Sequence, residues 1–385
     1  MKKFVRFLSY VLVAVLASAA SFMIAAVNLS RNDSVSKLEQ LEGLIQDKFI
    51  GEVDKTAMED AAAGAMIASL GDRWSFYLSA QEYGDYIDQM NNSYVGIGIT
   101  ILNEEGGDGF EIIRVEPSGP AQEAGLQVGD ILTGADGVSF AGMTTNEAAT
   151  IVKGEAGSTL NVQVLRHGEA MEFTVERRQI QVQVASGEML TEEVGLVTIV
   201  NFDSRCAQET IAAIESLLDQ GAQKLIFDVR NNPGGYKDEM VRILDYLLPE
   251  GPLFRSVDYA GREQVDHSDK ECLDIPMAVI VNEDSYSAAE LFAAALEEYD
   301  AAVVVGTQTC GKGYFQYTFE LVDGSAVALS VGKYTTPKGV SLANVGITPD
   351  VVVEVDEEVY AMIYNDLLDP GEDPQIGAAL QALEN

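Results

Sequence analysis

The spacing of hydrophobic residues changes along the chain and divides it into regions. Residues 35–49 and 56–70 carry apolar residues at steps of three and four, the spacing of amphipathic helices. From Tyr94 to about residue 179, short β-branched runs alternate with glycines, which is typical of a compact β-rich unit. The pattern therefore predicts a helical region over residues 35–90, followed by a β-rich unit.

Beyond about Gln181 the pattern changes again. Apolar runs at 195–202, 224–229, 277–282 and 301–306 are interleaved with amphipathic segments at 206–221, 238–248 and 287–299. Alternating strands and helices predict an α/β core with a largely parallel sheet. The acidic residues after Asp356 indicate one or two short helices.

The first residues have the pattern of a membrane segment. Lys2, Lys3 and Arg6 precede the uncharged run Phe7–Val27, which is long enough to span a bilayer. Its length and its scattered small residues favour an uncleaved anchor over a cleaved signal peptide, which remains the alternative. Basic residues before the run and acidic sequence after it predict that residues 28 onward lie outside the cytoplasm.

The charge balance excludes one class of partner. The chain has 61 acidic and 24 basic residues, a formal charge of -37, so its surface repels phosphate and no nucleic-acid partner is expected. The cysteines, Cys206, Cys272 and Cys310, have no C-x-x-C spacing, so they predict packed thiols and neither a disulfide framework nor a zinc site.

The β-rich unit resembles the PDZ domain. The resemblance rests on the stretch from Ala124 to Ile131, "AGLQVGDI", on the following Asp136-Gly137 and on a helix before "KGEAGS". It implies that a substrate C-terminus is added as an extra strand beside the glycine loop of "YVGIGITI", with its carboxylate on the loop amides. The peptide-binding residues are then Tyr94, Val95, Gly96, Ile97, Gly98 and Ile99.

Candidate catalytic residues lie in the α/β core. The chain has 2 histidines, His167 and His267, and neither has motif-like surroundings for a Ser-His-Asp triad. A neutral lysine can replace histidine as the base for a serine if burial lowers its pKa from about 10.4. "GTQTCGKGYFQ" offers Lys312, and if a strand holds both Lys312 and Gln316, their side chains share one face.

Four motifs of the core resemble those of the carboxyl-terminal processing peptidases. "VNEDSYSAAE" is similar to their V-N-x-x-S-A-S-A-S-E, with Tyr286 and Ala289 in place of alanine and serine, and "GKGYFQ" matches G-K-G-x-x-Q. "FDVRNNPGG" and "YTTPKGVSLANVGITPD" resemble two further motifs, and all occur in the family's order after a PDZ domain.

The resemblance implies a crotonase/ClpP-like α/β core and assigns roles to residues. The nucleophile falls on Ser287, the general base on Lys312 and the lysine-orienting residue on Gln316, while Ser285 is expected to cap a helix. The oxyanion donors are expected from Ala288 and from the turn at Gly234 and Gly235.

Two positions depart from the family pattern. Cys310 stands where phenylalanine or a similar residue usually precedes G-K-G. Lys153 stands where relatives that use the PDZ domain as a switch carry arginine, and lysine cannot make the planar bidentate contact of arginine. The second departure argues against peptide-gated activation by that route.

The sequence thus predicts a multidomain α/β serine endopeptidase that needs no cofactor or metal, is anchored at the extracytoplasmic face and cuts proteins near their C-termini. An inactive peptide-binding scaffold on the same fold and a crotonase-like acyl-CoA enzyme are the alternatives, and the helical region can serve a homodimer, as it does in relatives. The expected divisions are the anchor or signal 1–30, helical region 31–93, PDZ domain 94–179, protease core 180–356 and acidic helical tail 357–385.

Overall fold

The computed structural model describes residues 36–103, 109–365 and 367–384. The chain divides into two compact units, Met1–Ser69 and Leu70–Asn385. The expected membrane segment Phe7–Val27 lies outside the described residues. Among the helices that are described, none has the length and apolar character needed to cross a membrane.

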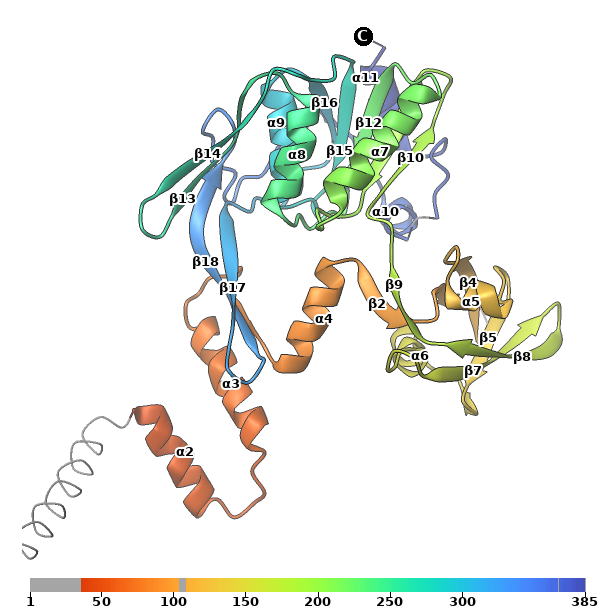
Figure 1. Ribbon diagram of the computed structural model, residues 1–385, viewed down its shortest axis with the longest axis vertical. Coiled ribbons are helices and arrows are strands. Elements are labelled where there is room, and N and C mark those ends of the chain that lie inside the picture. Colours follow the sequence, from red (N-terminus) through yellow and green to blue (C-terminus); the bar gives the residue numbers. More distant parts are fainter. Residues whose placement is uncertain (1–35, 104–108, 366, 385) are drawn as a thin grey trace, which may run out of the picture. The chain divides into compact units, whose positions relative to one another are not determined.

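The described part of the first unit consists of helices α2 (Lys37–Lys48) and α3 (Lys55–Ala68), as the apolar spacing predicts (Figure 1). The N-terminus of α2 is closed reciprocally, since the Glu39 N–H donates to Ser36 Oγ at 3.2 Å and the Ser36 N–H to Glu39 Oε2 at 2.7 Å. Asp54 Oδ1 accepts the Ala57 N–H at 3.0 Å and caps α3 through this single side-chain bond.

The second unit is built around a mainly parallel sheet, as the alternation of strands and helices predicts. From β11 to β19 neighbouring strands are parallel, and β10 pairs antiparallel at one edge. In spatial order the strands are β10 (Ala185–Met189), β11 (Val194–Ile199), β12 (Lys224–Asp228), β15 (Met277–Val281), β16 (Ala302–Gly306) and β19 (Val351–Val352).

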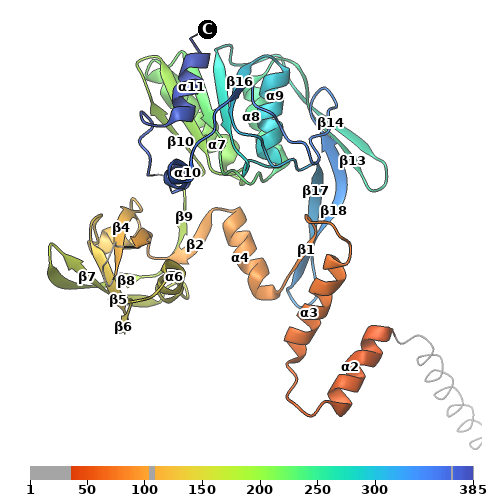
Figure 2. The same ribbon diagram turned by 180° about the vertical axis from the view of Figure 1, so that it is seen from behind.

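Helices cover both faces of this sheet (Figures 1 and 2). On one face, Phe227 and Val279 are buried in a core with residues of α7 (Cys206–Asp219), α8 (Lys237–Leu247) and α9 (Ala288–Glu298). On the other, Ile226 and Ile280 are buried with residues of α11 (Pro374–Ala382). The central strands are therefore buried on both sides, which is why they read as continuous apolar runs. Helix α10 (Glu357–Tyr364) precedes α11, so the acidic tail does form short helices.

A second sheet of the same unit is antiparallel, and the sequence pattern did not predict it. Its strands follow the order β1-β18-β13-β14, with β17 also paired to β18. Strand β1 comes from the region expected to be helical and is followed by α4 (Ala80–Met90). The bounds are β1 (Phe76–Leu78), β13 (Gly251–Asp258), β14 (Glu263–Ser268), β17 (Tyr314–Glu320) and β18 (Ala326–Thr335).

The β-rich unit has its own sheet, in the order β3-β4-β5-β7-β8, and its own core around Phe110, Leu132, Phe140 and Leu160. Strands β2 (Ser93–Gly96) and β9 (Arg178–Gln181) pair where the chain enters and leaves the unit. The remaining elements are β3 (Ile99–Asn103), β4 (Phe110–Val115), α5 (Pro120–Ala124), β5 (Ile131–Ala135), β6 (Val138–Ser139), α6 (Thr145–Val152), β7 (Thr159–Arg166) and β8 (Glu169–Glu176).

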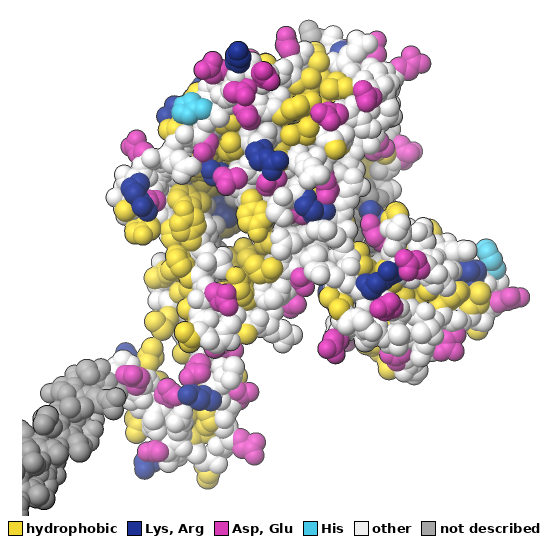
Figure 3. Space-filling model, viewed as in Figure 1, with side chains coloured by type: hydrophobic (Ala, Val, Ile, Leu, Met, Phe, Trp, Pro, Cys, Tyr) yellow, Lys and Arg dark blue, Asp and Glu magenta, His cyan; other side chains and the backbone are white. Residues whose placement is uncertain are grey.

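Acidic side chains are spread over the visible face rather than gathered into one patch (Figure 3).

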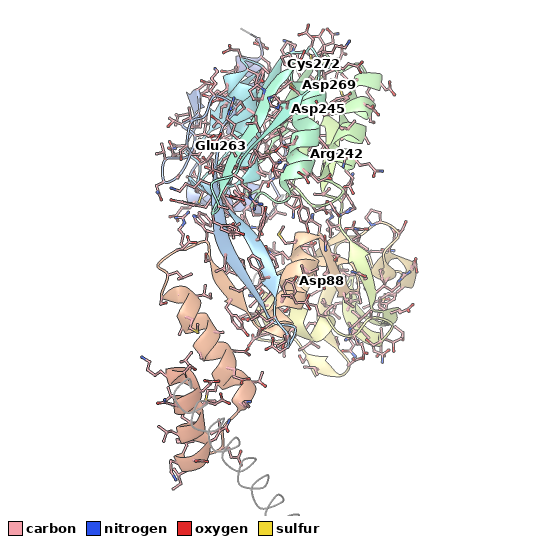
Figure 4. All side chains as sticks on the ribbon, turned by 60° about the vertical axis from the view of Figure 1, so that its left-hand side comes forward. Asp88, Arg242, Asp245, Glu263, Asp269 and Cys272 are labelled. Atoms are coloured by element: carbon pink, nitrogen blue, oxygen red, sulfur yellow. The ribbon has the colours of Figure 1, made fainter. Side chains whose placement is uncertain are left out.

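All three cysteines are free. Cys206 is a packed thiol, as expected, and burial raises its pKa to about 12. The expectation of a packed thiol is wrong for Cys272, which is exposed on the loop after β14 (Figure 4). In the same loop, the Asp269 N–H donates to Asp245 Oδ1 at 2.7 Å.

Candidate active site

The turn between β15 and α9 holds Ser287 in an unusual backbone conformation. Ser287 directly precedes α9, with φ 63° and ψ -119°, a region that non-glycine residues rarely occupy. Such strain persists only where the surroundings enforce it, and it occurs often at functional sites. The turn leaves Ser287 half-buried at the start of the helix.

Ser285 has a different environment from Ser287. It is 0% exposed, its hydroxyl donates to Val229 O at 2.7 Å, and it accepts the Asn282 N–H at 3.0 Å. The expectation that Ser285 caps a helix is therefore wrong, because the helix begins at Ala288 and Ser285 instead fastens its own turn to the chain after β12. A substrate cannot reach the Ser285 hydroxyl in this arrangement.

The "NNPGG" turn lies directly against the Ser287 turn. The side chains of Asn231 and Asn282 join the two, since Asn282 Nδ2 donates to Asn231 Oδ1 at 2.8 Å and the Asn231 N–H to Asn282 Oδ1 at 2.9 Å. A Cβ added to Gly234 would lie 2.7 Å from Ser287 Cβ, so only glycine permits this approach.

The expected oxyanion donors differ in availability. The Gly234 N–H already donates to Asn232 Oδ1 at 2.8 Å, so it is not free for a ligand in this structure. The N–H groups of Gly235 and Ala288 donate to no acceptor within the described residues. Ala288 is the first residue of α9, where helix geometry leaves the N–H group without an intrahelical partner.

Lys312 lies in the loop between β16 and β17, not in a strand. The expected shared strand face with Gln316 is therefore absent, because β17 begins at Tyr314. The pKa of Lys312 is lowered from 10.5 to about 8, mainly by burial and also by the nearby Arg73, while Cys310, Glu290 and Asp72 act in the opposite direction. No hydrogen bond in the described structure joins Lys312 Nζ to Ser287.

Gln316 lies in β17, the strand that follows this loop. Its Nε2 donates to Ser330 Oγ at 3.0 Å and to Tyr314 O at 3.2 Å. Ser330 in turn donates its N–H to Ser75 Oγ at 3.0 Å, and Ser75 Oγ donates to Asp72 at 2.6 Å. Within the described residues Gln316 thus belongs to a polar network beside Lys312 and makes no hydrogen bond to it.

Glu290 connects the two expected catalytic residues, a role that sequence reasoning missed. This glutamate is 0% exposed, and its Oε2 accepts the N–H groups of Ser287 at 3.1 Å and Lys312 at 3.0 Å. Its Oε1 accepts Thr309 Oγ1 at 2.6 Å and the Gly311 N–H at 2.7 Å. Burial raises the pKa of Glu290, and these four donors act against that rise. The sequence signals were the glutamate that ends the nucleophile motif and its place three residues after the helix-start serine, which is also the pattern of an ordinary helix cap.

Tyr334 and Trp74 also border the site. The Tyr334 hydroxyl donates to Lys312 O at 2.6 Å and interacts with the Ser287 side chain. Trp74 lies beside Tyr286, with ring centroids 5.9 Å apart. Neither residue could be recognised from the sequence, because strand pairing in the antiparallel sheet places them at the site.

His167 and His267 are exposed, and neither contacts Ser287 in the described part of the chain.

The expected peptide-binding residues belong to β2, to β3 and to the short link between these strands. Strand β3 is the edge strand of its sheet and packs beside α6. Ile97 and Gly98 lie between β2 and β3, and their N–H groups donate to no acceptor among the described residues. Tyr94, Val95 and Gly96 instead pair with β9, and Ile97 is buried. A backbone edge with free amides at one end suits a peptide C-terminus.

No group of three or more His, Cys, Asp or Glu side chains is placed to hold a metal ion in the described ranges. The groups that the structure brings together are the Ser287 hydroxyl, the Lys312 side chain and the N–H groups of Gly235 and Ala288. This combination is suited to acyl transfer through a covalent serine ester.

Comparisons with known proteins agree with this geometry. Residues 193–353 match the model of peptidase family S41, and residues 95–176 match a PDZ domain. The chain is 31% identical to the carboxy-terminal processing protease CtpA of Bacillus subtilis, over 91% of this chain and 77% of that protein. It is also 31% identical to a carboxyl-terminal-processing protease of Synechocystis, over 81% of this chain and 75% of that protein.

A solved structure shares the fold. Its title names it as an S41 protease from Bacteroides fragilis. The TM-score is 0.59, and the sequences are 18% identical over 83% of this chain and 90% of that one. The multidomain α/β architecture expected from the sequence is thereby confirmed. The family matches together with the relative in Bacillus subtilis establish that this chain belongs to the carboxyl-terminal processing proteases, serine proteases of family S41 that carry a PDZ domain.

Proposed function

We propose that this protease binds the C-terminus of an extracytoplasmic protein in its PDZ domain and cleaves near that end, with Ser287 as nucleophile and Lys312 as general base. The observation that carries the proposal is the position of Glu290. One buried carboxylate oxygen accepts the N–H groups of both Ser287 and Lys312, which fixes the two backbones in one site.

The reaction follows from the groups present. Neutral Lys312 takes the proton of Ser287 as Oγ attacks the substrate carbonyl carbon, and the carbonyl oxygen becomes an oxyanion. The free N–H groups of Ala288 and Gly235 are the candidate donors to it. When the C–N bond breaks, the Lys312 ammonium returns the proton to the leaving amine. Water, deprotonated by Lys312, then attacks the ester carbonyl, the bond from this carbon to Ser287 Oγ breaks, and Lys312 returns the proton to Ser287 as the new C-terminus leaves.

For catalysis, the Lys312 side chain must approach Ser287, and Gln316 can orient it there. Lys312 Nζ has to move from its present position toward Ser287, since no hydrogen bond joins them in the described structure. Gln316 uses its Nε2 in two hydrogen bonds, so its Oε1 is the group left to orient the lysine after that movement.

Activity is expected to rise with pH through an apparent pKa near 8. Lys312 acts as a base only when neutral, burial lowers its pKa to about 8, and the neutral fraction therefore grows as pH passes through that value. The measurement is kcat/KM for a fluorogenic peptide from pH 5 to 10. A profile that stays flat from pH 5 to 9 would remove Lys312 from the role of base.

A free substrate carboxylate is expected to strengthen binding. Two peptides of one sequence, one with a C-terminal acid and one with a C-terminal amide, should differ in KM by about 10- to 100-fold, because charge-assisted hydrogen bonds contribute about 1.5 to 3 kcal/mol. Acetylation of the N-terminus is the matched control and should change KM little. Equal kcat/KM for acid and amide would contradict capture through the Ile97–Gly98 loop.

The location outside the cytoplasm rests on the sequence before the described residues. We expect the full chain to sediment with membranes and a chain starting near Asn32 to remain in the supernatant, because the uncharged run Phe7–Val27 can span a bilayer. A native protein found free in the medium, with its N-terminus near residue 28, would identify that run as a cleaved signal instead. The homodimer stays a prediction.

A further inference from the structure

The Lys312 side chain lies over two aromatic rings. Its Nζ is 4.8 Å from the ring centroid of Trp74 and 5.8 Å from that of Tyr286. The two rings are 5.9 Å apart and inclined by 34°, so together they line one side of the space around the ammonium. Both distances are within the range at which a ring face attracts a cation.

These rings belong to segments held firmly in place. The Trp74 N–H donates to Asp72 Oδ1 at 3.2 Å, and Ser75 ties the same segment to β18 through the Ser330 N–H at 3.0 Å. Tyr286 directly precedes Ser287, and its N–H donates to Asn232 O at 3.1 Å. Tyr286 stands where the family's nucleophile motif has alanine, so this half of the ring pair is a departure from the family pattern.

We propose that Trp74 and Tyr286 form an aromatic holding site for the protonated Lys312 side chain, which keeps the lysine away from Ser287 until it has lost its proton. The proposal rests on the proposed role of Lys312 as base. A ring face attracts an ammonium ion through its quadrupole, and it has no such attraction for a neutral amine. Loss of the proton to solvent therefore removes the force that holds the side chain on the rings and leaves an amine competent to accept the Ser287 proton.

The other charged groups around Lys312 do not replace this interaction. The Glu290 oxygens are already occupied by four donors, and Asp72 accepts hydrogen bonds from Ser75 and Trp74. Arg73 lies over the Trp74 ring, with Cζ 4.1 Å from the centroid, and contacts Cys310 Sγ at 3.0 Å. Burial raises the pKa of the Tyr286 and Tyr334 hydroxyls, so neither phenol ionises near neutral pH.

Fluorescence can report on this holding site directly, because Trp74 is the only tryptophan of the chain. The emission of the full-length protein is expected to change between pH 6 and 10 with a midpoint near 8, the pKa of Lys312. The change should disappear in Lys312→Met and persist in Cys310→Ser, which removes the thiol that contacts Arg73 next to Trp74. Emission that does not change with pH, or that changes equally in Lys312→Met, would overturn the proposal.

The pH profile of cleavage gives a second test with a defined sign. Trp74→Leu removes the ring face but keeps the site apolar, so the rise of kcat/KM should move to lower pH by about half a unit to one unit. Trp74→Phe keeps a ring and should restore most of the wild-type profile. If Trp74 only excludes water, Trp74→Leu will instead hydrate Lys312 and move the rise to higher pH. A shift to higher pH, or a fall in activity without a shift, would contradict the holding site.

These outcomes are separable from failure of the proposed catalytic role. If Lys312→Met still cleaves peptides, the role of Lys312 as base is wrong whatever the fluorescence shows. If Lys312→Met is inactive but Trp74 emission does not follow Lys312, the catalytic role stands and the aromatic holding site is wrong.

Discussion

Replacement of Ser287 by alanine is expected to lower kcat/KM for peptide cleavage by at least about 10⁴-fold, because it removes the hydroxyl that forms the acyl ester. The neighbouring Ser285→Ala is the matched control. The Ser285 hydroxyl is buried and bonded to Val229 O, so its loss should reduce the free energy of unfolding by about 1 to 3 kcal/mol and leave cleavage measurable.

The two serines are tested with the same peptide assay and with thermal unfolding of each variant. An inactive Ser285→Ala enzyme with wild-type stability, together with an active Ser287→Ala enzyme, would show that the family alignment is displaced by two positions.

Lys312→Arg is expected to be inactive at every pH from 6 to 10, with a loss of a similar size. The guanidinium stays protonated throughout this range, so it cannot accept the serine proton. Lys312→Met tests the same role without a charge, and it should fold, since an apolar side chain of similar shape replaces a desolvated cation. The measurement is kcat/KM across the pH range.

Lys333→Arg is the matched control for Lys312→Arg, because Lys333 is another lysine that lies beside an aromatic ring. Its Nζ lies 5.8 Å from the Tyr314 centroid on the exposed side of β18, and Lys333→Arg should retain wild-type cleavage. A Lys312→Arg enzyme that cleaves peptides would contradict the account of lysine as base.

The parallel core was predictable because its strands are buried on both faces. Every residue of Met277–Val281 is buried, and such strands appear in sequence as uninterrupted apolar runs. The strands of the antiparallel sheet do not appear in the sequence as such apolar runs, so they were not predicted. Their residues alternate between buried and half-exposed, and their pairings join distant segments, as where Phe76 pairs with Ala328.

The same distinction explains what was and was not predicted in the site. Ser287 and Lys312 lie in local motifs, so both could be proposed as catalytic residues from the sequence, and the structure places them around one buried carboxylate. The burial of Ser285 depends on the carbonyl of Val229, which lies just after β12 and is distant in sequence. Trp74 precedes β1, whose pairing with β18 holds this segment beside Lys312. No spacing rule separates Ser285 from Ser287, because the backbone angle at Ser287 and these non-local contacts decide which hydroxyl is accessible.

Labelling with a peptidyl phosphonate tests the central claim most directly. The full chain is treated with the reagent, digested, and the modified residue is mapped by mass spectrometry. We expect one adduct, on Ser287, that forms at a similar rate in Ser285→Ala, forms much more slowly in Lys312→Met, and is absent in Ser287→Ala. An adduct on Ser285 or on any other residue, or labelling of Lys312→Met at the wild-type rate, would contradict a mechanism in which Lys312 activates Ser287.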